Sequence, residues 1–214
     1  ELYDKIVSRD DYIDNLKNMV ENNCFSKIHT DKRVSKKRID EMRSIQIMCV
    51  NLERIADFCV NVVRQMSYLS DSGFLRGFDY KPMLSEITKS MSQVLPAQTK
   101  GDLGGALSIC RSEFVLDQMY KSSFDRIMAE LASGRSVNDL ITVLFIFRYL
   151  ERIGDALLNI GEALLFFIIG EKVKIEQFQA LQKTLTSSGF TGSISDIDFR
   201  SFWGTRSGCR ISKV

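Results

Sequence analysis

The feature of this sequence that most constrains its fold is an internal repeat of ten residues. The segment 52–61 reads LERIADFCVN, and the segment 150–159 reads LERIGDALLN. A leucine, a glutamate, an arginine, an isoleucine, an aspartate and an asparagine recur in register. Self-similarity of this kind predicts a chain built from two related units, each with the same polar residues on an otherwise apolar helix.

A second acidic pair precedes each motif. Asp10 and Asp14 lie ahead of the first, and Glu113 and Asp117 lie at the matching place ahead of the second. Residues four apart share a helical face, so each unit carries two acidic pairs on two successive helices. Like charges at this spacing cost a few tenths of a kcal/mol per pair, roughly 1 to 2 kcal/mol for four pairs. Because this repulsion between carboxylates occurs four times, we expect a positively charged group between the helices.

Apolar residues recur at helical spacing through most of the first 185 positions, and alternating strand patterns are missing there, which predicts an all-α protein. The first unit is expected at 1–77 and the second at 78–186. The second unit has a helix ahead of its acidic helix that the first unit lacks, so the first is expected to be incomplete. A Gly- and Ser-rich tail at 187–214 predicts a β-hairpin or the start of another domain. The expected helices cover residues 2–25, 34–69, 82–99, 102–131, 136–169 and 174–185.

Composition excludes several classes of protein. The net charge of +2 is too small to attract nucleic acid to the protein as a whole. The most apolar stretch, 141–169, is interrupted by charged residues, which favours a buried helix over a membrane span. Five scattered cysteines are typical of reduced core thiols in the cytoplasm. We therefore expect a cytoplasmic protein that is at most peripheral to a membrane.

Three partners could compensate the acidic pairs. Arg54 and Arg152 adjoin the motif glutamates, but adjacent helical residues do not face each other, so these arginines would have to pair with other helices. Water would suffice if the pairs face solvent. Metal ions with oxygen ligands, namely Fe, Mn, Mg or Zn, are the third candidate, and the fourfold repetition favours them. The candidate ligands are Asp10, Asp14, Glu53, Asp57, Glu113, Asp117, Glu151 and Asp155.

Enzymatic alternatives find little support. A ferritin-like di-iron oxidase uses Glu-x-x-His on two helices, and the only histidine, His29, has Ser26 three residues before it. No nucleophile elbow, Walker lysine motif or His-Glu-x-x-His is present. We therefore expect no catalysis from the helical part.

The doubled motif, with Asp57 and Asp155 at its centre, resembles the motif that closes each repeat of the PhoU family, and the resemblance extends over about 1–185. It implies two three-helix bundles that carry multinuclear metal clusters on the eight acidic residues. It also implies a regulator that represses phosphate-starvation signalling through a phosphate ABC transporter and a membrane sensor kinase, with homo-oligomerisation left open. The family often has histidine after the motif aspartate, where this chain has Phe58 and Ala156. The alternative is a helical module that regulates a kinase-like domain beginning after residue 214.

Overall fold

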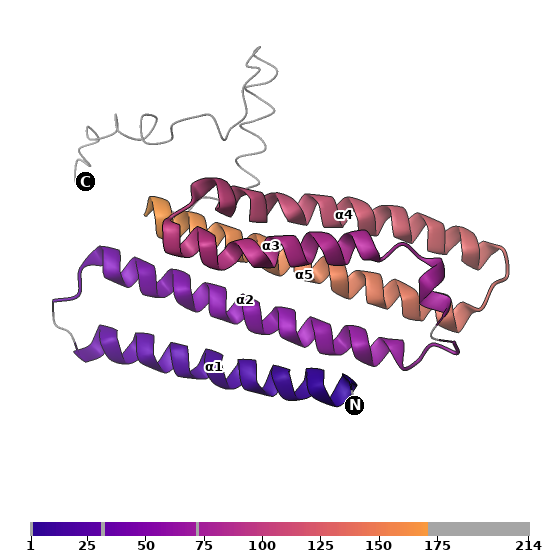
Figure 1. The fold of residues 1–214 in the computed structure, drawn as a ribbon, viewed down its shortest axis with the longest axis horizontal. Coiled ribbons are helices and arrows are strands. Elements are labelled where there is room, and N and C mark those ends of the chain that lie inside the picture. Colours follow the sequence, from indigo (N-terminus) through magenta and orange to yellow (C-terminus); the bar gives the residue numbers. More distant parts are fainter. Residues whose placement is uncertain (1, 31–32, 72, 171–214) are drawn as a thin grey trace, which may run out of the picture. The chain divides into compact units, whose positions relative to one another are not determined.

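The computed structural model describes residues 2–30, 33–71 and 73–170, which belong to the first of the chain's two compact units, 1–173. These residues form five α-helices and a short 3₁₀ helix and contain no strand (Figure 1). The expectation of an all-α fold is confirmed, while the expected helix at 174–185 and the tail at 187–214 lie outside the described residues. The elements are α1 (Leu2–Thr30), α2 (Lys36–Met66), η1 (Phe74–Gly77), α3 (Lys81–Lys100), α4 (Leu103–Ala132) and α5 (Val137–Ile169).

Several helix ends follow from local sequence signals. The Ser35 side chain caps α2 by accepting a hydrogen bond from the Arg38 backbone N–H at 3.3 Å. Gly101 ends α3 at φ 63° and Gly170 ends α5 at φ 82°. Glycine adopts this left-handed conformation without the steric cost that a Cβ would add, which is why both helices stop there.

The spacing of Ser136 and Asp139 predicts a capping box at the start of α5, and this prediction is wrong. Ser136 occupies the N-cap position, but its side chain makes no capping hydrogen bond and instead donates to Asp139 Oδ2 at 2.7 Å. Asp139 is 3% exposed and also accepts from Ser70, from the backbone N–H at 2.8 Å and from the hydroxyl at 2.7 Å. The aspartate therefore joins the chain after α2 to the start of α5, a long-range role that local spacing does not indicate.

The two repeats meet through α2 and α5, which run antiparallel. Asn159 donates to Asn51 Oδ1 at 3.2 Å, and the rings of Phe58 and Tyr149 lie 6.2 Å apart, so residue numbers rise on one helix as they fall on the other. Helix α1 covers α2, and α3 and α4 cover α5 (Figure 1).

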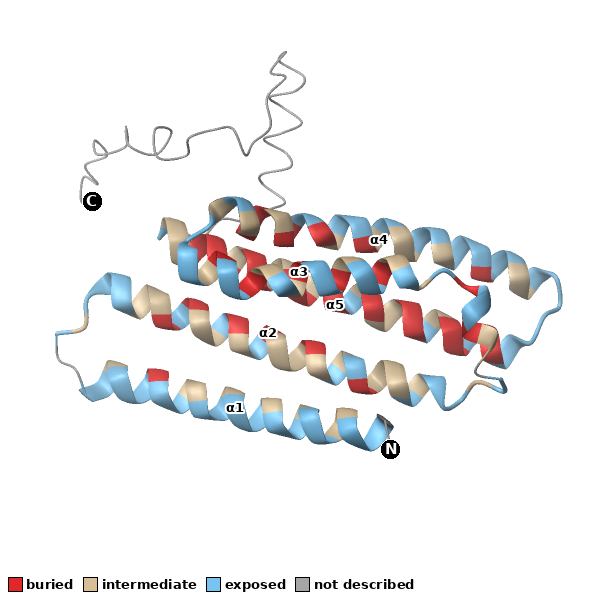
Figure 2. Ribbon diagram, viewed as in Figure 1, coloured by how far each residue is buried: buried red, intermediate tan, exposed pale blue. Residues whose placement is uncertain are grey.

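Helix α5 forms the centre of the core (Figure 2). A helix that is apolar on most of its circumference is buried in a protein interior, and 17 of the 33 residues of α5 are buried. No helix in the described ranges combines the length and the apolarity needed to cross a membrane. The interpretation of 141–169 as a buried helix is therefore confirmed.

The first repeat has an open apolar cavity of about 720 Å³ between α1 and α2, bordered by Met91 of α3. Ile13 and Leu52 line it and are half-buried. Their counterparts in the repeat alignment, Leu116 and Leu150, are at most 2% exposed. In the second repeat α3 packs beside α4 and α5, and no described helix takes that place in the first repeat.

The described cysteines agree only partly with the expectation of core thiols. All four are free, and Cys24 and Cys110 are buried, whereas Cys49 is half-buried. Cys59 is exposed because it lines the open cavity of the first repeat, so for this residue the expectation is wrong.

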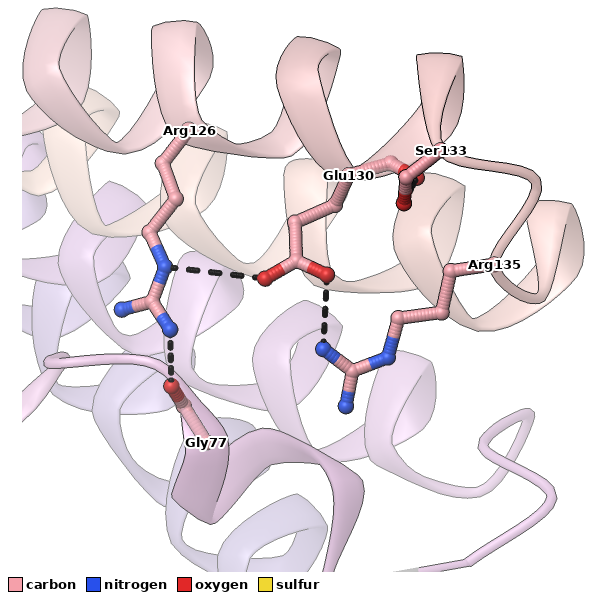
Figure 3. A network of polar contacts seen from close by, with 5 residues as sticks. All are labelled: Gly77, Arg126, Glu130, Ser133 and Arg135. Atoms are coloured by element: carbon pink, nitrogen blue, oxygen red, sulfur yellow. Dashed lines mark hydrogen bonds and ion pairs between the residues drawn. The ribbon is translucent and has the colours of Figure 1, made fainter.

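A polar network fixes the turn that leads into α3 (Figure 3). Arg126 of α4 donates to the Gly77 carbonyl at 2.7 Å, and its guanidinium lies 4.9 Å from the centre of the Phe78 ring. Glu130 lies 4.0 Å from Arg126 and 2.7 Å from Arg135. The end of α4 is thereby attached to η1 and Phe78, which precede α3.

Candidate metal sites

The antiparallel pairing of α1 with α2 brings together the four acidic residues predicted in the first repeat, here named the first quartet. Asp10 and Asp14 lie on α1, and Glu53 and Asp57 lie on α2. Asp14 and Asp57 are exposed, and the other two are half-buried. Burial raises the pKa of Asp10, and the charges of Asp57, Asp11, Glu53 and Asp14 raise it further in that order. The four carboxylates are therefore close enough to repel one another across the two helices.

The second quartet lies between α4 and α5, where the helices approach closely. It consists of Glu113 and Asp117 on α4 with Glu151 and Asp155 on α5, all half-buried. A Cβ on Gly154 would lie 3.0 Å from Leu116 Cδ1 and 3.6 Å from the Glu113 Cα. The glycine of the motif thus sets the α5 backbone against α4 beside the acidic residues.

The second quartet carries the same electrostatic conflict. Burial raises the pKa of Glu113, followed by the charges of Asp117, Asp155 and Glu151. Burial also raises the pKa of Glu151, and Asp155 adds to the shift while Arg148 and Arg152 oppose it. Partly desolvated carboxylates that face each other favour the protonated form, or a cation between them.

Basic side chains pair with several members of both quartets, and sequence reasoning missed most of these pairs. Arg152 was expected to pair with another helix, and this expectation is wrong. Its guanidinium lies 3.2 Å from the carboxylate of Asp155, three residues further along the same helix. The other pairs were not predicted, although spacings of three or four residues would have indicated all but the last: Arg148–Glu151 at 2.7 Å, Lys121–Asp117 at 2.7 Å, Lys17–Asp14 at 2.8 Å and Lys17–Glu53 at 2.9 Å. The bond from Lys17 to Glu53 joins two helices and depends on their register.

Each quartet contains one buried carboxylate oxygen without a hydrogen-bond partner. These are Asp10 Oδ1 in the first quartet and Glu151 Oε2 in the second. A buried acceptor left unsatisfied costs about 1–3 kcal/mol, and more when it is charged. Oxygens of this kind fit hard or intermediate cations, which take carboxylate ligands.

The quartets do not converge on single points in this conformation. Within the described residues, no three His, Cys, Asp or Glu side chains form a group that could hold a metal ion together. In the second quartet the basic partners hold three carboxylates along their own helices. Such partly exposed pairs contribute about 0–1 kcal/mol each, so turning the carboxylates toward a shared cation costs little.

The asparagines that end the two motifs, Asn61 and Asn159, do not extend the rows of acidic side chains on α2 and α5. Residues four apart share a helical face, which predicts that Asn159 stacks with Asp155. Instead, the Asn159 amide donates across the repeat interface to Asn51. Asn61 accepts from Arg64 on its own helix at 3.4 Å. The polar row on each of these helices therefore consists of the carboxylates alone.

The fold and these residues define a duplicated helical protein in which each repeat places four carboxylates between two antiparallel helices. The chain belongs to the PhoU family. The family model described as the PhoU domain matches residues 1–66 and 81–164, which include all eight acidic residues.

Curated relatives match most of the chain. The protein named phosphate-specific transport system accessory protein PhoU homolog of Borreliella burgdorferi is 30% identical over 180 residues, covering 80% of each chain. The protein of the same name in Clostridium acetobutylicum is 26% identical over 178 residues, covering 79% of this chain and 78% of the relative.

Solved structures show the same fold. The crystal structure of PhoU from Pseudomonas aeruginosa matches with a TM-score of 0.70 at 23% identity, over 79% of this chain and 82% of that one. The phosphate transport system regulatory protein PhoU from Streptococcus pneumoniae matches with a TM-score of 0.67 at 22% identity, over 81% and 82%.

Proposed function

We propose that this protein is an accessory regulator of phosphate uptake that represses phosphate-starvation signalling while phosphate is abundant. Family membership supports this role, since the relatives are named accessory proteins of the phosphate-specific transport system. We place it in the cytoplasm, in contact with a phosphate ABC transporter and a membrane sensor kinase. It acts there by binding rather than by catalysis.

We also propose that the quartets bind metal ions, among Fe, Mn, Mg and Zn. The observation that carries this proposal is the repeated placement of four mutually repelling carboxylates on two packed helices, with a buried oxygen in each quartet that lacks a partner. In the second quartet Glu113 and Asp117 would hold the metal from α4, and Glu151 and Asp155 from α5. A bound cation would compensate the charge and cross-link the two helices.

Metal content tests the binding proposal. The double variant Glu151→Ala, Asp155→Ala removes both α5 ligands, and we expect the purified protein to lose most of the metal of its second quartet by elemental analysis. The control is Asp79→Ala with Glu86→Ala, which removes the same charge outside the quartets. Unchanged metal content in the first variant would count against ligation by these groups.

A cellular assay tests the regulatory role separately. In cells lacking the gene, we expect a phosphate-starvation reporter to be active in phosphate-rich medium and the wild-type gene to silence it. If the reporter stays silent in the deletion strain, the protein is not a repressor of this response, whatever its metal content.

A further inference from the structure

The two quartets differ in one residue that reaches across helices. The Lys17 ammonium lies 2.8 Å from Asp14 Oδ1 on α1 and 2.9 Å from Glu53 Oε1 on α2. The Lys17 and Glu53 side chains are each only 19% exposed. An amphipathic lysine buries its stem and directs a compact positive charge to the carboxylates, so Lys17 already forms a cationic bridge between the helices.

Among the ion pairs of the described residues, none joins carboxylates on the two helices of the second quartet in this way. Lys121, Arg148 and Arg152 each pair with a single carboxylate on their own helix, and their side chains are 70%, 42% and 44% exposed. The repeat alignment that places Asp14 on Asp117 places Lys17 on Tyr120. Tyr120 contributes a ring that packs 6.4 Å from Phe124 and lies under Arg148 at 5.7 Å.

We infer that Lys17 is a built-in cation of the first quartet, occupying the place between α1 and α2 that a metal ion takes between α4 and α5. The inference rests on the proposed metal binding, and it makes the two quartets unequal. A metal ion entering the first quartet must displace the ammonium from Asp14 and Glu53 or share these carboxylates with it, and like charges at such short range repel strongly. The second quartet has only peripheral cations to displace, so it fills first.

Lys17 does not satisfy the whole first quartet. It contacts Asp14 and Glu53, whereas Asp10 retains a buried oxygen without a partner. The first quartet thus consists of two carboxylates that Lys17 pairs with directly and two that it does not. Withdrawal of the lysine would restore a complete set of four carboxylates, which makes Lys17 the residue that sets how tightly this site binds metal.

The test is a titration of chelator-treated protein with Mn²⁺, followed by calorimetry and by the electron paramagnetic resonance signal of free Mn²⁺. Lys17→Met keeps the apolar stem and removes the charge. We expect wild type to show one tight class of site and a second class at least about tenfold weaker. In Lys17→Met we expect the weaker class to tighten to match the first. Lys121→Met is the matched control, because it removes one ammonium from the second quartet and should leave the weak class unchanged.

Each outcome separates this inference from the proposed function. Two equally tight classes in wild type that Lys17→Met does not change would overturn the inference and leave metal binding intact. Absence of any Mn²⁺ binding in both proteins would overturn metal binding, and this inference with it. Should Lys17→Met fail to fold, Lys17→Gln keeps a hydrogen-bond donor without charge, and the same tightening of the weak class is expected.

Discussion

A close approach of α4 to α5 depends on Gly161, and its replacement by alanine gives a quantitative prediction. A Cβ at Gly161 would collide with the Cys110 sulfur and would lie 3.1 Å from the Cys110 backbone nitrogen and 3.2 Å from the Ala106 carbonyl oxygen. The sulfur can turn away, but the two backbone atoms move only if the helices separate. Overpacking of a buried contact costs about 1–3 kcal/mol, and we expect the upper end here.

The helical preference of alanine opposes this cost by about 1 kcal/mol. The net loss is therefore about 2 kcal/mol, which lowers Tm by about 4–8 °C for a chain of this length. Thermal unfolding of Gly161→Ala followed by circular dichroism measures it.

Gly104→Ala is the matched control, because a Cβ there would meet only the Asp102 side chain, at 3.3 Å. We expect this variant to be as stable as wild type or more so. A Gly161→Ala protein that is at least as stable as wild type would refute the close packing of α4 on α5.

Two further predictions concern charged groups. Hydrogen bonds from the Ser70 backbone, the Ser136 hydroxyl and the Ser70 hydroxyl lower the pKa of Asp139. The charged Asp139 therefore stabilises the fold above its unfolded pKa of about 4, and this stabilisation is lost as the pH falls through its folded pKa. Asp139→Asn should accordingly lower Tm at pH 7 and have no such effect in acid. An equal decrease in Tm at every pH would contradict this account. The pKa of Glu113 is raised, so its charged form destabilises the metal-free fold above about pH 4. Glu113→Gln should raise Tm at pH 7 in the presence of a chelator, and an unchanged or lower Tm would argue against repulsion within the second quartet.

The sequence was sufficient to predict the five described helices and a chain built from two related repeats, because these depend on local periodicity and on the doubled motif. The ends of α3 and α5 followed from Gly101 and Gly170, which tolerate a conformation that other residues avoid. The role of Asp139 was not predictable, since its partner Ser70 lies 69 residues away.

The acidic residues were identified from their spacing, but the lysines and arginines that pair with them were not. The pairs of Asp117 with Lys121 and of Glu151 with Arg148 are visible in the sequence once spacings of three and four residues are checked. The bond from Lys17 to Glu53 is different, because it requires the register between α1 and α2, which only the folded chain provides. Whether the eight carboxylates ligate metal remains a prediction.

Anomalous diffraction from crystals grown with Mn²⁺ tests the central claim most directly. With data collected on both sides of the metal's absorption edge, we expect a peak between α4 and α5, about 2.0–2.6 Å from oxygens of Glu113, Asp117, Glu151 and Asp155. The peak should vanish in crystals of the Glu151→Ala, Asp155→Ala variant. A well-ordered wild-type map with no peak at this position would contradict the account.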